Sequence, residues 1–459
     1  MGRDQPFDSP YSLYGAEHLD TAEHRQLAKE AALQSITLLR NGGTASGAPL
    51  LPFKPSAKLF IGGPNANSSA ALLSNYHGSN NIVNQNTPLL SLQRRGVVAS
   101  SAQGVTIAGN DTSGIAAAAK AAKAAADGAV LFLGLDDTQE AETRDRHDLK
   151  LPGEQLALAK AVVAAQPRTA IVLICAGAVD VTTLLSLSPT VSLLWAGYGG
   201  ELAGEAIADI LLGVASPSGR LSASIYSDAL TTRRNISNMD LRSQGGITYQ
   251  YTTAGDITIP FGFGLSYSSF SFRSLTAHAT TTAAHMAAQH GAMAEATAAA
   301  AHYKTAFEPD LPTYLVNVTN TGSVTSDVSV LGFVAATSSV RGAADDAPLR
   351  ELFDFERLAA LAPGESRVVQ LAVPPAVLSL TDATGVESVR AGDYLLEFGV
   401  RAPRLSPAVP LADDASCGAG PGRCRGPASR GDTARRRRGA GAVRAPATMK
   451  GHLPQNPRT

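Results

Sequence analysis

The chain has 459 residues, of which 44% are hydrophobic and 17% are charged, and its formal net charge is -1. This length suits two or three domains, and the near-zero charge excludes a global attraction to nucleic acid or to anionic membranes. Three cysteines provide no disulfide framework, and the longest apolar runs are too short to span a bilayer. We therefore expect neither a nucleic acid nor a membrane as partner.

Apolar runs alternate with helical patterns through the first half of the chain. A helix is predicted over 21–41, with Thr21 as its N-cap and Leu27 on its apolar face. The predicted strands are 58–63, 129–135, 169–177, 190–197 and 219–226, and further helices are predicted over 112–128, 152–167 and 199–213. Continuously apolar strands separated by helices indicate a mostly parallel sheet with helices on both faces. The sequence thus predicts an α/β sandwich domain over 21–228.

The pattern changes to an all-β type in the second half. Short strands separated by turn residues occur at 313–335, 366–374 and 392–400. They indicate an immunoglobulin-like sandwich over 270–402. Residues 229–269 are predicted to be an interdomain linker.

Two biased segments interrupt or follow the second domain. The alanine- and histidine-rich segment 276–303 carries His278, His285, His290 and His302 without acidic support, so we interpret it as an inserted helix or loop and expect no metal site. Residues 403–459 are rich in Gly, Pro and Arg and are predicted to be a disordered tail. We interpret its Arg435–Arg438 run as solvated.

Charged residues crowd into the stretch "GLDDTQEAETRDRHDLKLPGEQ", which runs from Gly134 to Gln155. It follows the predicted strand 129–135 directly. Ligands of open parallel sheets bind at the carboxyl ends of the strands, so the position makes this stretch a candidate site. By its chemistry alone, a solvated surface loop is the simpler interpretation.

Several stretches, taken together, resemble glycoside hydrolase family 3. They are "LAKEAALQSITLLRNG", "LFIGGPNANSSAALLSNYHG", the charged stretch, "WAGYGGELAGEAIADILLGVASPSGRLSASIY" and "IPFGFGLSYSSF". The resemblance covers about residues 10–402, as the family's α/β sandwich and fibronectin type III-like domains. The "EAExxDR" and "NYHG" forms are most similar to the β-xylosidase and arabinosidase branch. The resemblance implies a cofactor-free, retaining β-glycosidase that acts on β-xylosides or related plant-type glycosides or oligosaccharides.

The resemblance also implies the catalytic residue. Retaining glycosidases use two carboxyl groups about 5–5.5 Å apart, one as nucleophile and one as general acid/base. The family pattern, a Glu three residues before Asp-Arg, places the acid/base at Glu142, with Glu140 as the alternative. Asp145 and Arg146 are expected to pair with each other or with neighbouring loops and so to hold the segment in place.

Weaker candidates and departures from the family pattern complete the site. Asn75, Tyr76 and His147 are candidates for sugar contacts, with an ordinary turn and a surface histidine as the alternatives. Thr143 stands where the family usually has a small residue, often Gly. Arg144 adds a cation that we expect to lower the pKa of the neighbouring glutamate.

Family members begin with a (β/α)₈ barrel that supplies the nucleophile from a motif containing Trp. The single tryptophan here, Trp195, lies in an apolar strand, so we expect this chain to lack the nucleophile and residues 1–20 to be a remnant of a barrel linker. A separate barrel domain is then a possible partner. The alternatives are a barrel-less carbohydrate-binding or interaction module and a degenerate fragment without activity.

The compartment stays open. Four sequons, at Asn67, Asn110, Asn235 and Asn317, would be usable only in a secreted protein. Secretion is typical of the family, but the opening residues hold no signal-peptide pattern.

Overall fold

The computed structural model describes residues 13–43, 47–78, 85–253, 255–276, 313–336, 347–381, 385, 387–389, 393–399 and 442–444. The chain divides into two compact units. The first is Met1–Ile236 with Asp256–Ile259 and Phe263–Tyr267, and the second is Ser237–Gly255, Pro260–Gly262 and Ser268–Thr459. Most of the predicted insertion, its four histidines and all of the predicted tail except 442–444 lie outside the described residues.

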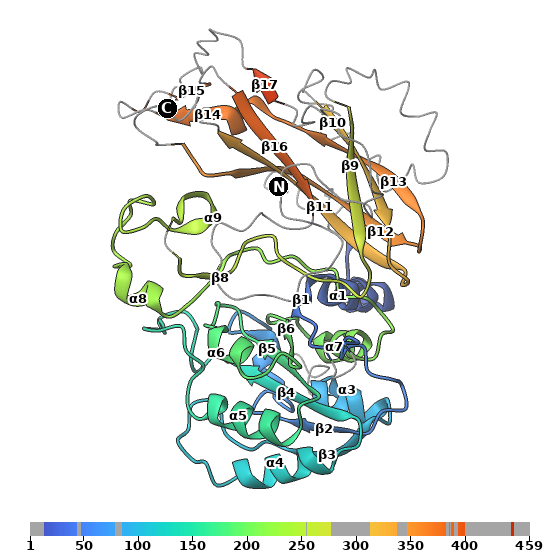
Figure 1. The fold of residues 1–459 in the computed structure, drawn as a ribbon. Coiled ribbons are helices and arrows are strands. Elements are labelled where there is room, and N and C mark those ends of the chain that lie inside the picture. Colours follow the sequence, from blue (N-terminus) through green and yellow to red (C-terminus); the bar gives the residue numbers. More distant parts are fainter. Residues whose placement is uncertain are drawn as a thin grey trace, which may run out of the picture. The chain divides into compact units, whose positions relative to one another are not determined.

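The first unit is built on a six-stranded sheet (Figure 1) with the order β1-β6-β5-β4-β2-β3. Its strands are β1 (Thr37–Arg40), β2 (Leu59–Gly62), β3 (Val98–Ala102), β4 (Gly128–Gly134), β5 (Thr169–Ile174) and β6 (Ser192–Trp195). All pairs are parallel except β1 with β6. Every residue of β4 and β5 is buried, which explains their continuously apolar sequences. The predicted parallel α/β fold is confirmed.

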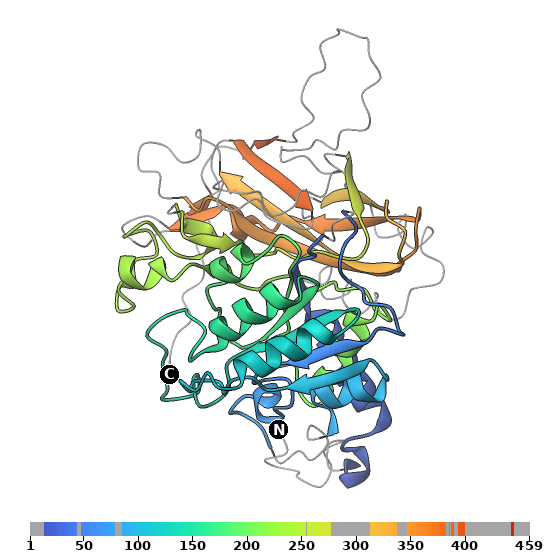
Figure 2. The same cartoon turned by 60° about the horizontal axis from the view of Figure 1, so that its bottom comes forward.

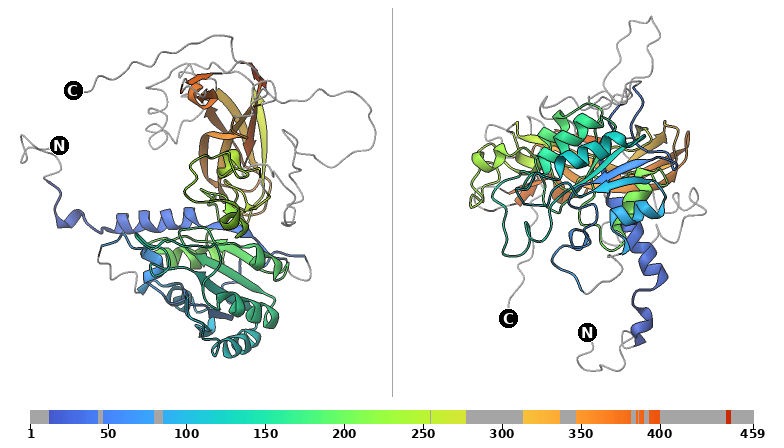
Figure 3. Two further views of the ribbon diagram at one scale, coloured as in Figure 1. Left: turned by 90° about the vertical axis from the view of Figure 1, so that its left-hand side faces the viewer. Right: turned by 90° about the horizontal axis from the view of Figure 1, so that it is seen from below.

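Helices cover both faces of this sheet. They are α1 (Ala22–Ser35), α2 (Ala70–Leu73), α3 (Pro88–Arg94), α4 (Ile115–Ala124), α5 (Gln155–Ala165), α6 (Thr182–Ser186) and α7 (Ala203–Leu211), with a 3₁₀ turn at Ala16–His18. Helices α4 and α5 pack together on one face, and α7 packs with α1 and α3 on the other (Figures 2 and 3). The last segments of the unit are β7 (Ile225–Tyr226), α8 (Ala229–Arg233) and β8 (Ile257–Ile259).

Two predicted elements of the first unit are wrong in extent. The helix predicted over 21–41 starts as expected, with Thr21 Oγ1 accepting from the His24 N–H at 3.2 Å, but it ends at Ser35. The next residues form β1, because their side chains are all buried when they pair with the sheet edge at β6. Leu27, expected on the apolar face of the helix, is 65% exposed. The strand predicted over 219–226 shrinks to β7, which pairs antiparallel with β8 outside the main sheet.

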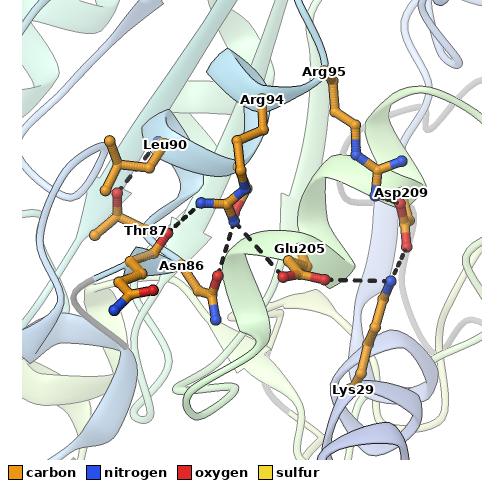
Figure 4. Close-up of polar contacts among 10 residues, drawn as sticks. Lys29, Asn86, Thr87, Leu90, Arg94, Arg95, Glu205 and Asp209 are labelled. Atoms are coloured by element: carbon orange, nitrogen blue, oxygen red, sulfur yellow. Dashed lines mark hydrogen bonds and ion pairs between the residues drawn. The ribbon is translucent and has the colours of Figure 1, made fainter. Parts of the chain in front are cut away.

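A network of charged side chains links α1, α3 and α7 on one face of the sheet (Figure 4). Asp209 on α7 is 3% exposed and is paired with two cations. Its carboxylate lies 2.8 Å from Lys29 Nζ on α1, and Arg95, which follows α3, donates to its other oxygen. Glu205 extends the network at 3.5 Å from Lys29 Nζ and 3.7 Å from Arg94 Nη2. A buried acid thus connects three helices that are far apart in sequence.

The second unit contains a sandwich of antiparallel sheets, one with the order β13-β10-β9 and one with the order β12-β11-β16-β17. The strands are β9 (Phe270–Thr276), β10 (Thr313–Asn320), β11 (Ser326–Ala336), β12 (Glu351–Leu361), β13 (Ser366–Ala372), β14 (Ser379–Thr381), β15 (Glu387–Val389), β16 (Asp393–Gly399) and β17 (Ala442–Arg444), with α9 (Thr248–Tyr251) before them and a 3₁₀ turn at Pro375–Leu378. Inward-facing residues of both sheets, among them Val316, Val330 and Leu371, form its core. The predicted all-β sandwich is confirmed, and β17 adds three residues of the predicted tail to it.

Candidate functional site

The candidate site lies in the loops that follow the carboxyl ends of the parallel strands. The chain passes from β2 to β3 on one side of β2 and then to β4 on its other side. The order in which strands are added to the sheet therefore reverses at β2. Two fully buried amide side chains bridge the strand ends here. Asn65 Nδ2 donates to the carbonyl of Leu135 at 2.9 Å, and Gln155 bonds both the N–H and the carbonyl of Gly134 at 2.8 Å. The loops beyond these bridges carry the charged side chains of the site.

Glu140 is held by three donors from two other loops. Its carboxylate accepts hydrogen bonds from the N–H of Ala176 at 2.8 Å, the N–H of Gly177 at 3.1 Å and the Tyr198 hydroxyl at 2.8 Å. Ala176 and Gly177 follow β5, and Tyr198 follows β6. Burial, followed by the hydrogen bond to Glu140, raises the pKa of Tyr198. The Glu140 side chain is only 16% exposed, so this carboxylate is a fixed anchor.

Arg146 completes the surroundings of Glu140. Its Nη1 lies 3.6 Å from Glu140 Oε2 and donates to the carbonyl of Ala178 at 3.0 Å. The sequence predicted that Asp145 and Arg146 pair with each other or with neighbouring loops. Arg146 pairs with Glu140 of its own loop and with the loop after β5, while Asp145 is exposed. The cation therefore compensates the buried charge of Glu140.

Glu142 has a different environment, although it is only two residues away. It lies in a tight turn in which the Arg144 N–H donates to the carbonyl of Ala141 at 2.9 Å, and its side chain is exposed. The Glu142 carboxylate acts on the Tyr76 hydroxyl and raises the pKa of Tyr76, because a nearby acceptor favours the protonated phenol. Asn75 acts on the same hydroxyl with the smaller, opposite effect on its pKa. The structure thus brings together Asn75, Tyr76 and Glu142, which come from the loops after β2 and β4.

Two further charged residues belong to the same stretch. His147 is exposed on the same loop, and the Arg144 guanidinium donates to the carbonyl of Asp137 at 2.8 Å. Sequence reasoning missed Tyr198 and the backbone of residues 176–177. Both follow apolar strands, so the strand-end argument that selected the charged stretch, applied to the next two strands, would have found them.

Thr143 occupies a backbone conformation that favours glycine. Its φ is 67°, at the third position of the turn from Ala141 to Arg144. A β-branched residue in this left-handed region is strained, which gives a physical reason for the small residue expected at this position.

Replacing Thr143 by glycine is expected to increase the free energy of unfolding of the first unit by roughly 0.5–1 kcal/mol. Relief of about 1–2 kcal/mol of strain outweighs the added entropy of glycine in the unfolded chain. Urea unfolding measures the change. Asp145→Gly is the matched control, because Asp145 has no positive φ and should lose stability. Equal effects of the two glycines would contradict the strain at Thr143.

Cys175 directly precedes Ala176 and Gly177, whose N–H groups bind Glu140. It is fully buried, and burial, followed by the charge of Glu140, raises the pKa of its thiol from 9.0 to about 12. The folded chain therefore holds this proton more tightly than the unfolded chain.

The stabilising effect of the protonated Cys175 thiol is complete below pH 9 and is lost as the pH rises toward 12. In this window we expect Cys175 to contribute a loss of about 1.4 kcal/mol per pH unit. Unfolding free energies of the wild type and of Cys175→Ala across the window test this expectation. The variant should show the shallower decline, and parallel curves would refute the raised pKa.

The described residues contain no group of three or more His, Cys, Asp or Glu side chains suited to hold a metal ion. In the same part of the chain, no helix has the length and apolar character needed to cross a membrane.

Comparison with known proteins identifies two matching family models. The glycosyl hydrolase family 3 C-terminal domain matches residues 36–267, and the fibronectin type III-like domain matches residues 334–401. A probable exo-1,4-beta-xylosidase of Aspergillus terreus is 32% identical over 402 residues, which cover 86% of this chain and 48% of that protein. Beta-D-xylosidase 1 of Arabidopsis thaliana is 32% identical over 402 residues, which cover 85% and 50%.

Solved structures show the same relationship. A GH3 exo-beta-xylosidase in complex with a xylobiose aziridine activity-based probe matches with a TM-score of 0.72 and 28% identity, covering 85% of this chain and 49% of that one. A GH3 beta-glucosidase of Bifidobacterium adolescentis matches with a TM-score of 0.67 and 26% identity, covering 84% and 53%. The chain therefore spans about half the length of the relatives that it matches.

Proposed function

Because the chain belongs to glycosyl hydrolase family 3, we propose that it supplies the acid/base half of a retaining β-glycosidase active site, with Glu142 as the general acid/base. The observation that carries the proposal is the contrast between two carboxylates of one loop. Glu140 is largely buried and accepts three hydrogen bonds, whereas Glu142 is exposed near the hydroxyl of Tyr76. An acid/base must exchange its proton with substrate and water, so Glu142 fits the role and Glu140 does not.

In the proposed reaction, a nucleophilic carboxylate attacks the anomeric carbon while Glu142 protonates the departing oxygen. Glu142 then removes a proton from the water that releases the sugar. The proposed role of Tyr76, whose hydroxyl interacts with Glu142, is to orient the carboxylate between the two steps. Each proton that Glu142 gives in the first step is regained in the second.

We place the nucleophile in an amino-terminal half of the kind that the longer relatives possess, on this polypeptide or on a separate one. The half-length coverage of the xylosidases supports this division. We propose β-xylosides as the substrates because the similar curated proteins carry xylosidase names. A role in xylan breakdown follows from these substrates. Asn75, Tyr76 and His147 are proposed to line the site on the side of this chain.

The test joins this chain to the amino-terminal half of the Arabidopsis relative, in place of that protein's own aligned half. The hybrid is expected to release nitrophenol from 4-nitrophenyl β-xyloside, and the isolated chain is expected to release none. Turnover by the isolated chain that depends on Glu142 would overturn the placement of the nucleophile. A folded hybrid that binds xylose by calorimetry but hydrolyses no glycoside would favour a carbohydrate-binding module.

A further inference from the structure

We infer that Glu140 is a positioning residue, which fixes the turn that carries Glu142 and so sets where the Glu142 carboxylate lies. The inference rests on the proposed function, because Glu142 is the group positioned. It assigns Glu140 a role that depends on the position of its side chain and on the hydrogen bonds that the side chain accepts, without contact with substrate.

The first support is the convergence of donors on Glu140. Two successive backbone N–H groups, from Ala176 and Gly177, point at one carboxylate, and the Tyr198 hydroxyl donates to the same oxygen as Ala176. Hydrogen bonds to an ionised acceptor are roughly twice as strong as neutral ones. The loop after β4 is therefore attached at this residue to the loops after β5 and β6.

The second support is the close approach of the backbone at Gly177. A Cβ atom at this position would lie 2.6 Å from Glu140 Oε2 and 3.1 Å from Arg146 Nη1. Because any larger residue would displace both side chains, the ion pair depends on a glycine at this point. Gly177 thus offers a way to move the Glu140 carboxylate without removing its charge.

The third support is the short connection between anchor and turn. Ala141 alone separates Glu140 from Glu142, and its carbonyl begins the turn by accepting from the Arg144 N–H at 2.9 Å. The Arg144 guanidinium donates a hydrogen bond to the carbonyl of Asp137 at 2.8 Å and so holds the other side of the turn. A displacement of the Glu140 anchor must therefore move the Glu142 side chain.

Electrostatics favours the same arrangement. Two carboxylates two residues apart would repel each other if both were free. Arg146 and three donors compensate the charge of Glu140, so little of that charge is left unbalanced beside the turn.

The experiment uses the full chain with ¹³Cζ-labelled tyrosine and follows the Tyr76 resonance, assigned by Tyr76→Phe, through a pH titration. Glu142→Ala should shift the titration of Tyr76 to lower pH, because the phenol loses the bond that retains its proton. Glu140→Ala should shift it in the same direction. The double variant should show no further shift beyond Glu142→Ala, because both changes remove the same contact.

Two further variants separate position from charge. Glu140→Gln removes the same charge as Glu140→Ala but keeps an acceptor for the three donors, so Tyr76 should titrate closer to the wild type. Gly177→Ala keeps every charge but displaces the Glu140 carboxylate, so it should shift Tyr76 to lower pH. Near-ultraviolet circular dichroism verifies that each variant is folded. If Glu140→Ala does not fold, Gly177→Ala and Glu140→Gln still provide the test.

The outcomes distinguish this inference from the proposed function. If Glu142→Ala shifts Tyr76 while Glu140→Ala and Gly177→Ala leave it unchanged, the positioning role is overturned and the contact at Glu142 stands. Equal shifts for Glu140→Gln and Glu140→Ala would also overturn it, because charge alone would then explain both. If Glu142→Ala leaves Tyr76 unchanged, the contact is absent and both the inference and the site geometry fail.

Discussion

Replacing Glu142 by glutamine is expected to lower kcat of the hybrid enzyme by about 10²- to 10⁴-fold on an alkyl or unactivated β-xyloside. Glutamine matches glutamate in size but cannot transfer a proton. The leaving oxygen of an unactivated glycoside depends on that proton, so the first chemical step slows. Steady-state kinetics of the hybrid with a series of leaving groups measure the effect.

The leaving-group series is also the control for this prediction. A dinitrophenolate departs without protonation, so its first step should be nearly unaffected by Glu142→Gln. Asp137→Asn removes a carboxylate from the same loop and should leave kcat near the wild-type value. An equal loss for good and poor leaving groups would contradict general acid catalysis by Glu142.

Replacing Asp209 by asparagine is expected to reduce the free energy of unfolding of the first unit by about 2–3 kcal/mol. The change keeps the size of the side chain but leaves the charges of Lys29 and Arg95 without their acid. Their side chains are 23% and 36% exposed, so water compensates part of the loss. Urea unfolding followed by the fluorescence of Trp195, which lies in β6 of this unit, measures the change.

Glu205→Gln is the matched control for Asp209. Glu205 belongs to the same network and the same helix, but its side chain is 32% exposed and its ion pairs are 3.5 Å and 3.7 Å long. A pair of this kind contributes about 0–1 kcal/mol. Equal losses for the two variants would mean that burial of the acid does not set the strength of this network.

The parallel sheet could be predicted because its central strands are buried on both faces. Strands β4 and β5 are continuously apolar, and this pattern does not depend on the rest of the chain. The apolar residues of β1, Leu38 and Leu39, fit a helical face as well as a strand. Only pairing with β6, about 150 residues later, decides between the two. Strand β3 was missed because its half-buried and exposed residues alternate in a short sequence of small side chains.

The candidate site shows a similar limit. The sequence placed Asn75, Tyr76 and Glu142 among the candidates, and the structure brings them together. It could not separate the roles of Glu140 and Glu142, since both are glutamates of one loop. The difference comes from groups 36 and 58 residues further along the chain, Ala176 and Tyr198, which bind Glu140 and leave Glu142 exposed.

The most direct test of Glu142 as the acid/base is the product that its alanine variant forms with azide. In the hybrid, Glu142→Ala removes the base that activates water and opens space in which a small anion can attack the glycosyl intermediate. With an activated β-xyloside, azide is expected to restore turnover and to yield β-xylosyl azide, with the configuration retained. Failure of azide to restore turnover, with no xylosyl azide in the product, would contradict the assignment of Glu142.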